Sequence, residues 1–153
     1  MLVENDIRER MEIEDKILSH VQAALLVALQ CPIERSTAGQ WLERICFLGD
    51  SFRRHVERLF AIEEDAGYMD FIAEGQRPTL GHDADDLRNE HGILVCGLSL
   101  AVQAARNTVP VDLTDLYAVQ GRFLALLEHF KRHRDKEHEL WMEAYLVDIG
   151  GEG

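Results

Sequence analysis

The sequence predicts an all-α protein folded as an up-down-up-down bundle of four helices. Four long stretches repeat apolar side chains at the spacing of one helical face. The only prolines, Pro32, Pro78 and Pro110, lie between these stretches, where a proline can end or begin a helix. No stretch alternates apolar and polar residues beside hairpin-type turns, so strands are not expected. Long helices joined by short connections pack as a four-helix bundle.

The first two helices lie on either side of Pro32. The first is expected over residues 6–30, with a core stripe of Ile13, Ile17, Ala24 and Val27, widened by Leu25 and Ala28. It ends at Cys31, because a residue before proline avoids the α-helical region. The second helix begins near Ser36 or Thr37, both favourable N-caps. Its core positions are Trp41, Ile45, Leu48, Phe52, Leu59 and Ala66.

The last two helices lie on either side of Pro110. Residues 75–83 mix Gly, Pro, Thr and Asp, which predicts a loop. The third helix follows over residues 84–106, with a core face of Leu87, Leu94, Leu98, Ala101 and Ala105. Thr114 is expected to cap the fourth helix, which reaches residue 147 and ends before Gly150-Gly151.

Composition and charge limit the classes of function. The 153 residues are 46% hydrophobic and 29% charged, which fits a single globular domain over residues 1–153. The net charge of −12 opposes binding to nucleic acid. No apolar run is long enough to cross a membrane, and residues 1–10 do not resemble a signal peptide, so a cytoplasmic protein is expected. The three cysteines form no C-x-x-C pair and predict no disulfide framework.

Histidines and glutamates interrupt the apolar stripes that are expected to face the core, here called the seams of the bundle. On the fourth helix, His133 and Glu137 occupy positions where a core helix normally carries leucine, and their four-residue spacing puts them on one face. The second helix aligns with the fourth at an offset of 74 residues, which matches Glu63 to Glu137. The first and third helices each carry one histidine in the apolar stripe, His20 and His91.

Buried carboxylates at these positions need a positively charged partner, because an unpaired buried charge is strongly destabilising. No Lys or Arg is expected at the seam positions, whereas a metal ion would neutralise the glutamates and also bind the imidazole nitrogens. Imidazole and carboxylate ligands suit iron, manganese or zinc, and bridging carboxylates suit a pair of ions.

These residues lie in recognisable segments of the four helices: His20, F-A-I-E-E-D-A-G-Y-M, E-H-G-I-L and H-F-K-R-H-R-D-K-E-H-E-L-W. Over nearly the whole chain, the sequence resembles the hemerythrin-like (HHE cation-binding) family. The resemblance implies a bundle that holds a non-heme di-iron centre, bridged by carboxylates from the second and fourth helices. Members of that family bind dioxygen, sense oxygen or iron, or handle iron and nitric oxide.

Carried over position by position, the resemblance implies five metal ligands: His20, Glu63, His91, His133 and Glu137. Glu63 and Glu137 would be the bridging carboxylates. One position departs from the pattern, because Leu59 stands where the family has the histidine of a His-x-x-x-Glu pair. The centre is therefore expected to hold one or two ions, with one position short of a ligand. His55 and His129 are expected on the helix flanks, with His55 as the candidate substitute.

Three functions remain open. The first is binding or sensing by non-heme iron, with zinc or manganese as substitutes and a small ligand such as dioxygen or nitric oxide. The second is a metal-free bundle that acts as a protein-interaction or regulatory module. The third is redox catalysis at the iron, on peroxide or nitric oxide. The sequence has no Gly-rich phosphate loop and no nucleophile motif, and we favour binding or sensing over catalysis.

Overall fold

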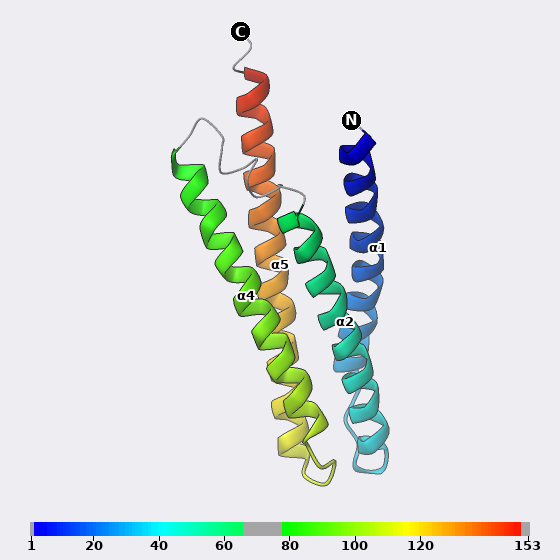
Figure 1. Cartoon of the computed structure of the whole chain (residues 1–153). Helices are drawn as coiled ribbons and strands as arrows, with labels where there is room; N and C mark the ends of the chain where they lie inside the picture. Colours follow the sequence, from blue (N-terminus) through cyan, green and yellow to red (C-terminus); the bar gives the residue numbers. More distant parts are fainter. Residues whose placement is uncertain (1, 66–77, 151–153) are drawn as a thin grey trace.

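The computed structural model describes the backbone of residues 2–65 and 78–150 and the side chains of residues 5–65 and 83–143. The long helices are α1 (Leu2–Gln30), α2 (Ala38–Asp65), α4 (Pro78–Arg106) and α5 (Leu113–Gly150), and a short 3-10 helix, η1 (Arg35–Thr37), precedes α2. Successive helices alternate in direction, so that α1 begins and α5 ends at the same end of the bundle (Figure 1). Each helix packs against the next, and α1 also contacts α5. The predicted four-helix bundle is confirmed, and the described residues contain no strand.

The core faces predicted for α2 and α4 are confirmed. On α2, Trp41, Ile45, Phe52 and Leu59 are buried, and on α4 all five predicted positions are buried. Apart from Leu87, these residues join one continuous apolar core with Val119, Phe123 and Phe130 of α5. Because the amphipathic pattern of these helices has one apolar face, the sequence alone determines which side packs inward. The side chain of Ala66 lies outside the described residues.

Two helix starts differ from the prediction. α4 begins at Pro78, six residues before the expected start at residue 84. Proline suits the first turn of a helix because its φ is already helical and its missing N–H has no helical partner there. On α5 the cap is Asp112, whose Oδ1 accepts the backbone N–H of Thr114 at 2.9 Å, so Thr114 is not the capping residue.

The main core stripe predicted for α1 is wrong, whereas the two residues expected to widen it, Leu25 and Ala28, are buried. Ile13, Ile17, Ala24 and Val27 are all exposed, Val27 to 64%. The buried face is instead formed by Glu14, Leu18, Leu25, Ala28 and Leu29. α1 carries two neighbouring apolar stripes, and helical spacing alone does not distinguish which one faces the core.

Side chains of two other helices fix the rotation of α1. The indole N–H of Trp41 on α2 donates to the carbonyl of Ala28 at 3.1 Å. The Nε2 of Gln120 on α5 donates to the carbonyl of Leu29 at 2.6 Å. Both acceptors belong to the last turn of α1, whose carbonyls lack helical partners. These two hydrogen bonds from α2 and α5 hold α1 in a rotation in which Leu25 is buried and His20 is exposed.

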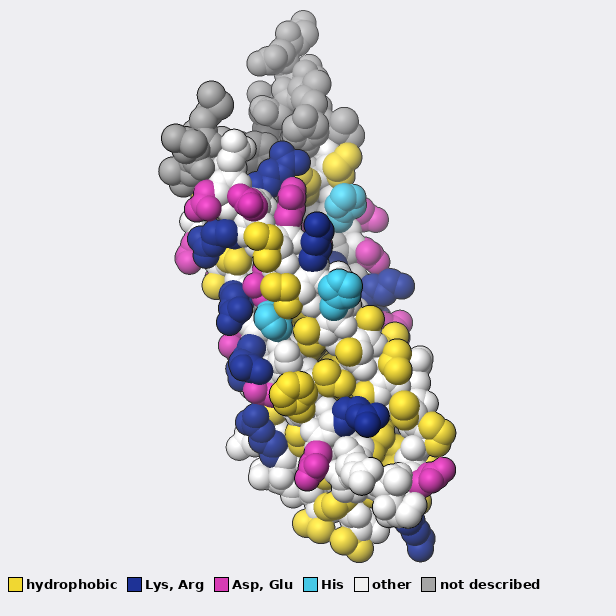
Figure 2. Space-filling model, turned by 90° about the vertical axis from the view of Figure 1, so that its right-hand side faces the viewer, with side chains coloured by type: hydrophobic (Ala, Val, Ile, Leu, Met, Phe, Trp, Pro, Cys, Tyr) yellow, Lys and Arg dark blue, Asp and Glu magenta, His cyan; other side chains and the backbone are white. Residues whose placement is uncertain are grey.

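Charged and apolar side chains are unevenly distributed along the bundle. On the face drawn in Figure 2, hydrophobic side chains gather mainly in the lower half, and the histidines lie above that region. Within the described part of the chain, no helix is long and apolar enough to pass through a lipid bilayer.

A close approach at Gly49 gives a test of the packing. A Cβ on Gly49 would lie 2.8 Å from Cε1 and Cζ of the buried Phe123 ring, whereas a Cβ on Gly121 would meet nothing within 4 Å. Gly49→Ala is expected to lower the free energy of unfolding by about 1–3 kcal/mol, because the tightly packed ring must move. Gly121→Ala is expected to raise it by about 0.5–1 kcal/mol through helix propensity. Urea denaturation of both variants measures the contrast, and equal effects would contradict this packing.

Candidate metal centre

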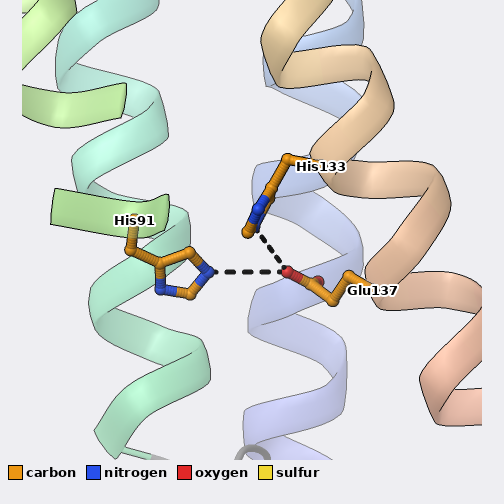
Figure 3. Close-up of side chains that lie close together, drawn as sticks. All are labelled: His91, His133 and Glu137. Atoms are coloured by element: carbon orange, nitrogen blue, oxygen red, sulfur yellow. Dashed lines mark hydrogen bonds and ion pairs between the residues drawn. The ribbon is translucent and has the colours of Figure 1, made fainter. Parts of the chain in front are cut away.

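Three buried side chains from two helices meet in the core of the bundle. His91 comes from α4, and His133 and Glu137 come from α5 (Figure 3). Glu137 Oε2 lies 3.2 Å from His133 Nε2 and 3.5 Å from His91 Nε2. The ligand atoms of the three residues all lie within 4.8 Å of one another, so the group can hold a metal ion. Their burial is nearly complete, at 3% exposed or less.

Glu63, near the end of α2, brings a second carboxylate to the group. Its Oε2 lies 3.6 Å from His91 Nε2, and the residue is completely buried. Neither of these two atoms has a hydrogen-bond partner. Buried polar atoms without partners are rare in folded proteins, because leaving them unsatisfied costs about 1–3 kcal/mol each. The two unsatisfied atoms face one another, which marks a position for a missing bonding partner.

Two outer carboxylates hold the histidine rings from behind. Nδ1 of His91 lies 3.1 Å from Glu64 Oε1, and Nδ1 of His133 lies 2.9 Å from Glu90 Oε2. In a neutral ring this contact places the hydrogen on Nδ1, and the lone pair of Nε2 then points inward. A lone pair facing carboxylate oxygens is repulsive unless a proton or a metal cation lies between them. Histidines that bind metals commonly donate their second nitrogen to a carboxylate in this way.

The spacing between the inward atoms suits a small metal ion. Glu137 Oε2 lies 3.2 Å from His133 Nε2 and 3.5 Å from His91 Nε2, and Glu63 Oε2 lies 3.6 Å from His91 Nε2. Ligands at the usual zinc distances in a tetrahedron lie about 3.3–3.4 Å from one another. Direct hydrogen bonds would be shorter than two of the three separations. Only the His133–Glu137 separation lies in the hydrogen-bond range, so the two contacts of His91 Nε2 are the ones that a shared ion would complete.

Phe60 of α2 covers one side of the group. Its ring stacks on the His91 ring at 3.8 Å between centroids and 7° between planes. It also meets the His133 ring edge-on, with 5.3 Å between centroids. This contact fixes both imidazole planes and keeps water away from them.

Arg134 corrects the expectation that no positive side chain reaches the buried glutamates. Its Nη1 donates to Glu63 Oε1 at 2.7 Å and to Glu137 Oε1 at 2.9 Å. Its Nη2 donates to Asp15 Oδ1 on α1 at 2.8 Å. The long side chain starts from a flank position of α5 and reaches into the core, so the seam pattern did not reveal it.

The two buried carboxyls differ in proton affinity. Burial raises the pKa of Glu63 well above its usual value, and the nearby charge of Glu137 raises it further. Burial alone would also raise the pKa of Glu137, but its contacts with the His133 and His91 rings, together with the charge of Arg134, outweigh it and leave that pKa below its usual value. Of the two carboxyls, Glu63 therefore has the higher affinity for a proton.

Four of the five predicted ligands lie together, namely Glu63, His91, His133 and Glu137. The fifth, His20, is exposed on α1, and the structure does not bring it to this group. Leu59 is buried in the apolar core and carries no ligand atom.

The remaining histidines lie elsewhere. His55 Nδ1 pairs with the buried Glu14 of α1 at 2.5 Å, and His129 Nε2 lies 3.7 Å from Glu90 Oε1, so neither joins the group. His138 is exposed, as its position after Glu137 predicts. The side chain of His82 lies outside the described residues.

Sequence reasoning missed the residues that surround the ligands: Phe60, Glu64, Glu90 and Arg134. Three of them carried a signal. Glu64 and Glu90 are acidic neighbours of Glu63 and His91 in the sequence. Arg134 stands three residues before Glu137, a spacing that allows an ion pair on one helix.

No family model, curated protein or solved structure matches this chain. The resemblance to hemerythrin-like proteins stays a prediction from the sequence.

Proposed function

We propose that this protein is a hemerythrin-like metal-binding protein that holds non-heme iron and binds or senses a small ligand such as dioxygen or nitric oxide. The observation that carries the proposal is the convergence of His91 Nε2, His133 Nε2 and Glu137 Oε2, with Glu63 Oε2 beside them. Two imidazoles and a carboxylate are the donor set of many non-heme Fe(II) sites, and the same donors bind zinc.

Bound iron would supply a reversible redox couple and affinity for dioxygen or nitric oxide. The chain supplies the surroundings. Glu64 and Glu90 hold the His91 and His133 rings with Nε2 inward. Phe60 excludes water from one side of these rings. Such surroundings favour a protected binding site over catalysis on a large substrate.

An acidic groove next to the site supports the proposal that the protein binds a metal cation. It has a volume of about 600 Å³ and is lined by residues that include Asp83, Asp86, Glu90, Lys136, Glu139 and Glu143. Glu90 belongs to both the groove and the ring support of His133. Five carboxylates against one ammonium raise the local concentration of cations.

Metal titration tests the proposal. Chelator-treated protein titrated with Co(II), and separately with Fe(II) under nitrogen, is expected to bind at least one equivalent. His133→Ala is expected to lower the affinity more than about 100-fold, because even residues that only support metal ligands contribute about 10–100-fold. Visible absorption of cobalt and elemental analysis measure binding.

His20→Ala is the matched control, because His20 is exposed on α1 and lies outside the buried group. It is expected to bind metal as the wild type does. Loss of binding in His20→Ala would show that α1 supplies a ligand after all. Less than about a tenth of an equivalent in the wild type, after anaerobic loading, would refute the proposal.

Arg134 favours the metal-free bundle as the second candidate, because its guanidinium already pairs with both buried glutamates. In that case the protein would act as an interaction or regulatory module. Thermal melting with and without chelator separates the two candidates. Metal that binds only the folded state must raise the melting temperature, whereas a bundle that binds no metal melts at the same temperature in both samples.

A further inference from the structure

The two carboxylates of the site are each divided between two kinds of partner. The Oε1 atoms of Glu63 and Glu137 both accept from Nη1 of Arg134, at 2.7 and 2.9 Å. The Oε2 atoms both face His91 Nε2, at 3.6 and 3.5 Å. A carboxylate that bridges two metal ions divides its oxygens in the same way. In this protein, the guanidinium of Arg134 occupies the side of the two carboxylates where a second metal ion would otherwise bind.

We propose that Arg134 serves as the second cation of the centre, so that the bundle binds one metal ion beside His91 and His133 and no second ion. This inference rests on the proposed metal binding. It adds that one ion binds, and it explains why a second ion does not.

The side of the site toward α1 supports this assignment. A second ion there would need its own ligands, but Leu59 has no lone pair and His20 is exposed. Asp15 of α1 instead accepts Nη2 of Arg134 at 2.8 Å. Arg134 is thereby anchored from α1 while it binds the carboxylates, and its side chain is only 27% exposed. A planar guanidinium with several fixed donors suits this bridging position.

Charge balance leads to the same number of ions. Glu63, Glu137 and Asp15 supply three negative charges when ionised, and Arg134 supplies one positive charge. One divalent ion makes the group neutral. A second divalent ion would have to be balanced by Glu64 and Glu90, but these carboxylates are partly exposed and already face the outer nitrogens of His91 and His133.

Arg134→Gln tests the role of the guanidinium. Without it, the buried carboxylates repel one another, and the metal-free variant is expected to melt about 10 °C lower than the wild type. The site also loses a positive charge close to the ion. Zinc is therefore expected to bind at least about tenfold more tightly and to raise the melting temperature at least twice as much as in wild type.

The control variants separate this role from general effects of charge. Arg132→Gln removes an exposed positive charge from the same helix and is expected to change neither quantity. Arg134→Lys keeps the charge and is expected to melt closer to the wild type than Arg134→Gln does. If Arg134→Gln does not fold without metal, refolding with zinc is expected to restore its helical circular dichroism.

Several outcomes would overturn the inference. Two equivalents bound by the wild type would refute it and leave the proposed function intact. No metal bound by the wild type would refute both. Weaker zinc binding by Arg134→Gln, or failure of zinc to rescue its folding, would show that Arg134 only positions the carboxylates.

Discussion

Glu63→Gln is expected to stabilise the metal-free bundle at neutral pH and to weaken metal binding more than about 100-fold. Glu63 is fully buried, and burial together with Glu137 raises its pKa well above the usual value. Glutamine keeps the shape and a hydrogen-bond acceptor for Arg134 but removes the charge. The expected gain is about 1–3 kcal/mol in the free energy of unfolding, because a buried carboxylate next to another carboxylate is unfavourable when ionised.

The pH dependence of stability has a definite sign. A carboxyl with a raised pKa binds more protons in the folded state than in the unfolded state. Metal-free wild type should therefore lose stability as the pH rises from about 4.5, the ordinary pKa of a glutamate, through the raised pKa of Glu63 in the folded state. Urea denaturation at a series of pH values measures this loss. Glu63→Gln is expected to remove it.

Glu137→Gln is the matched comparison. The pKa of Glu137 is lowered by its contacts with the His133 and His91 rings and by Arg134, so the ionised form stabilises the fold. Both variants should lose metal, but Glu137→Gln should be less stable than the metal-free wild type. If the two variants changed stability in the same direction, the pKa values of Glu63 and Glu137 would not be shifted in opposite directions.

The sequence predicted the bundle because α2, α4 and α5 each have a clear apolar face and the prolines separate the helices. It also predicted four of the buried polar residues, since His91, His133, Glu137 and Glu63 stand where leucine is normal. α1 was different. Its two adjacent apolar stripes satisfy the same spacing, and contacts with Trp41 and Gln120 determine which stripe is buried. The expected position of His20 was wrong for that reason.

Arg134 shows a second limit of sequence patterns. A periodicity marks the positions of Cα atoms around a helix, but a long side chain can carry its charge from the flank into the core. Arg132, two residues earlier on α5, is exposed to solvent. Only the fold reveals that Arg134 lies opposite Glu63 of α2 and Asp15 of α1. Ion pairs between distant segments leave no local signal in a single sequence.

Phe60→Ala is expected to lower the free energy of unfolding by about 3–5 kcal/mol and to weaken metal binding as well. The ring is buried and forms aromatic contacts with His91, His133 and Phe130. Removing the ring leaves a cavity beside both imidazoles, and the His91 ring loses the aromatic surface on which it stacks. Water can then enter the cavity and hydrogen-bond to the nitrogen atoms that face the proposed ion.

Phe60→Leu and Phe47→Ala separate packing from ring support. Phe47 is 70% exposed, so Phe47→Ala should leave both stability and metal binding near the wild-type values. Leucine at position 60 refills most of the volume but cannot stack on an imidazole. Phe60→Leu should therefore recover most of the stability in urea denaturation, while its cobalt affinity stays below that of the wild type. If Phe60→Leu bound cobalt as tightly as the wild type, stacking on His91 would have no part in holding the metal ligands, and the outer carboxylates Glu64 and Glu90 alone would orient the rings.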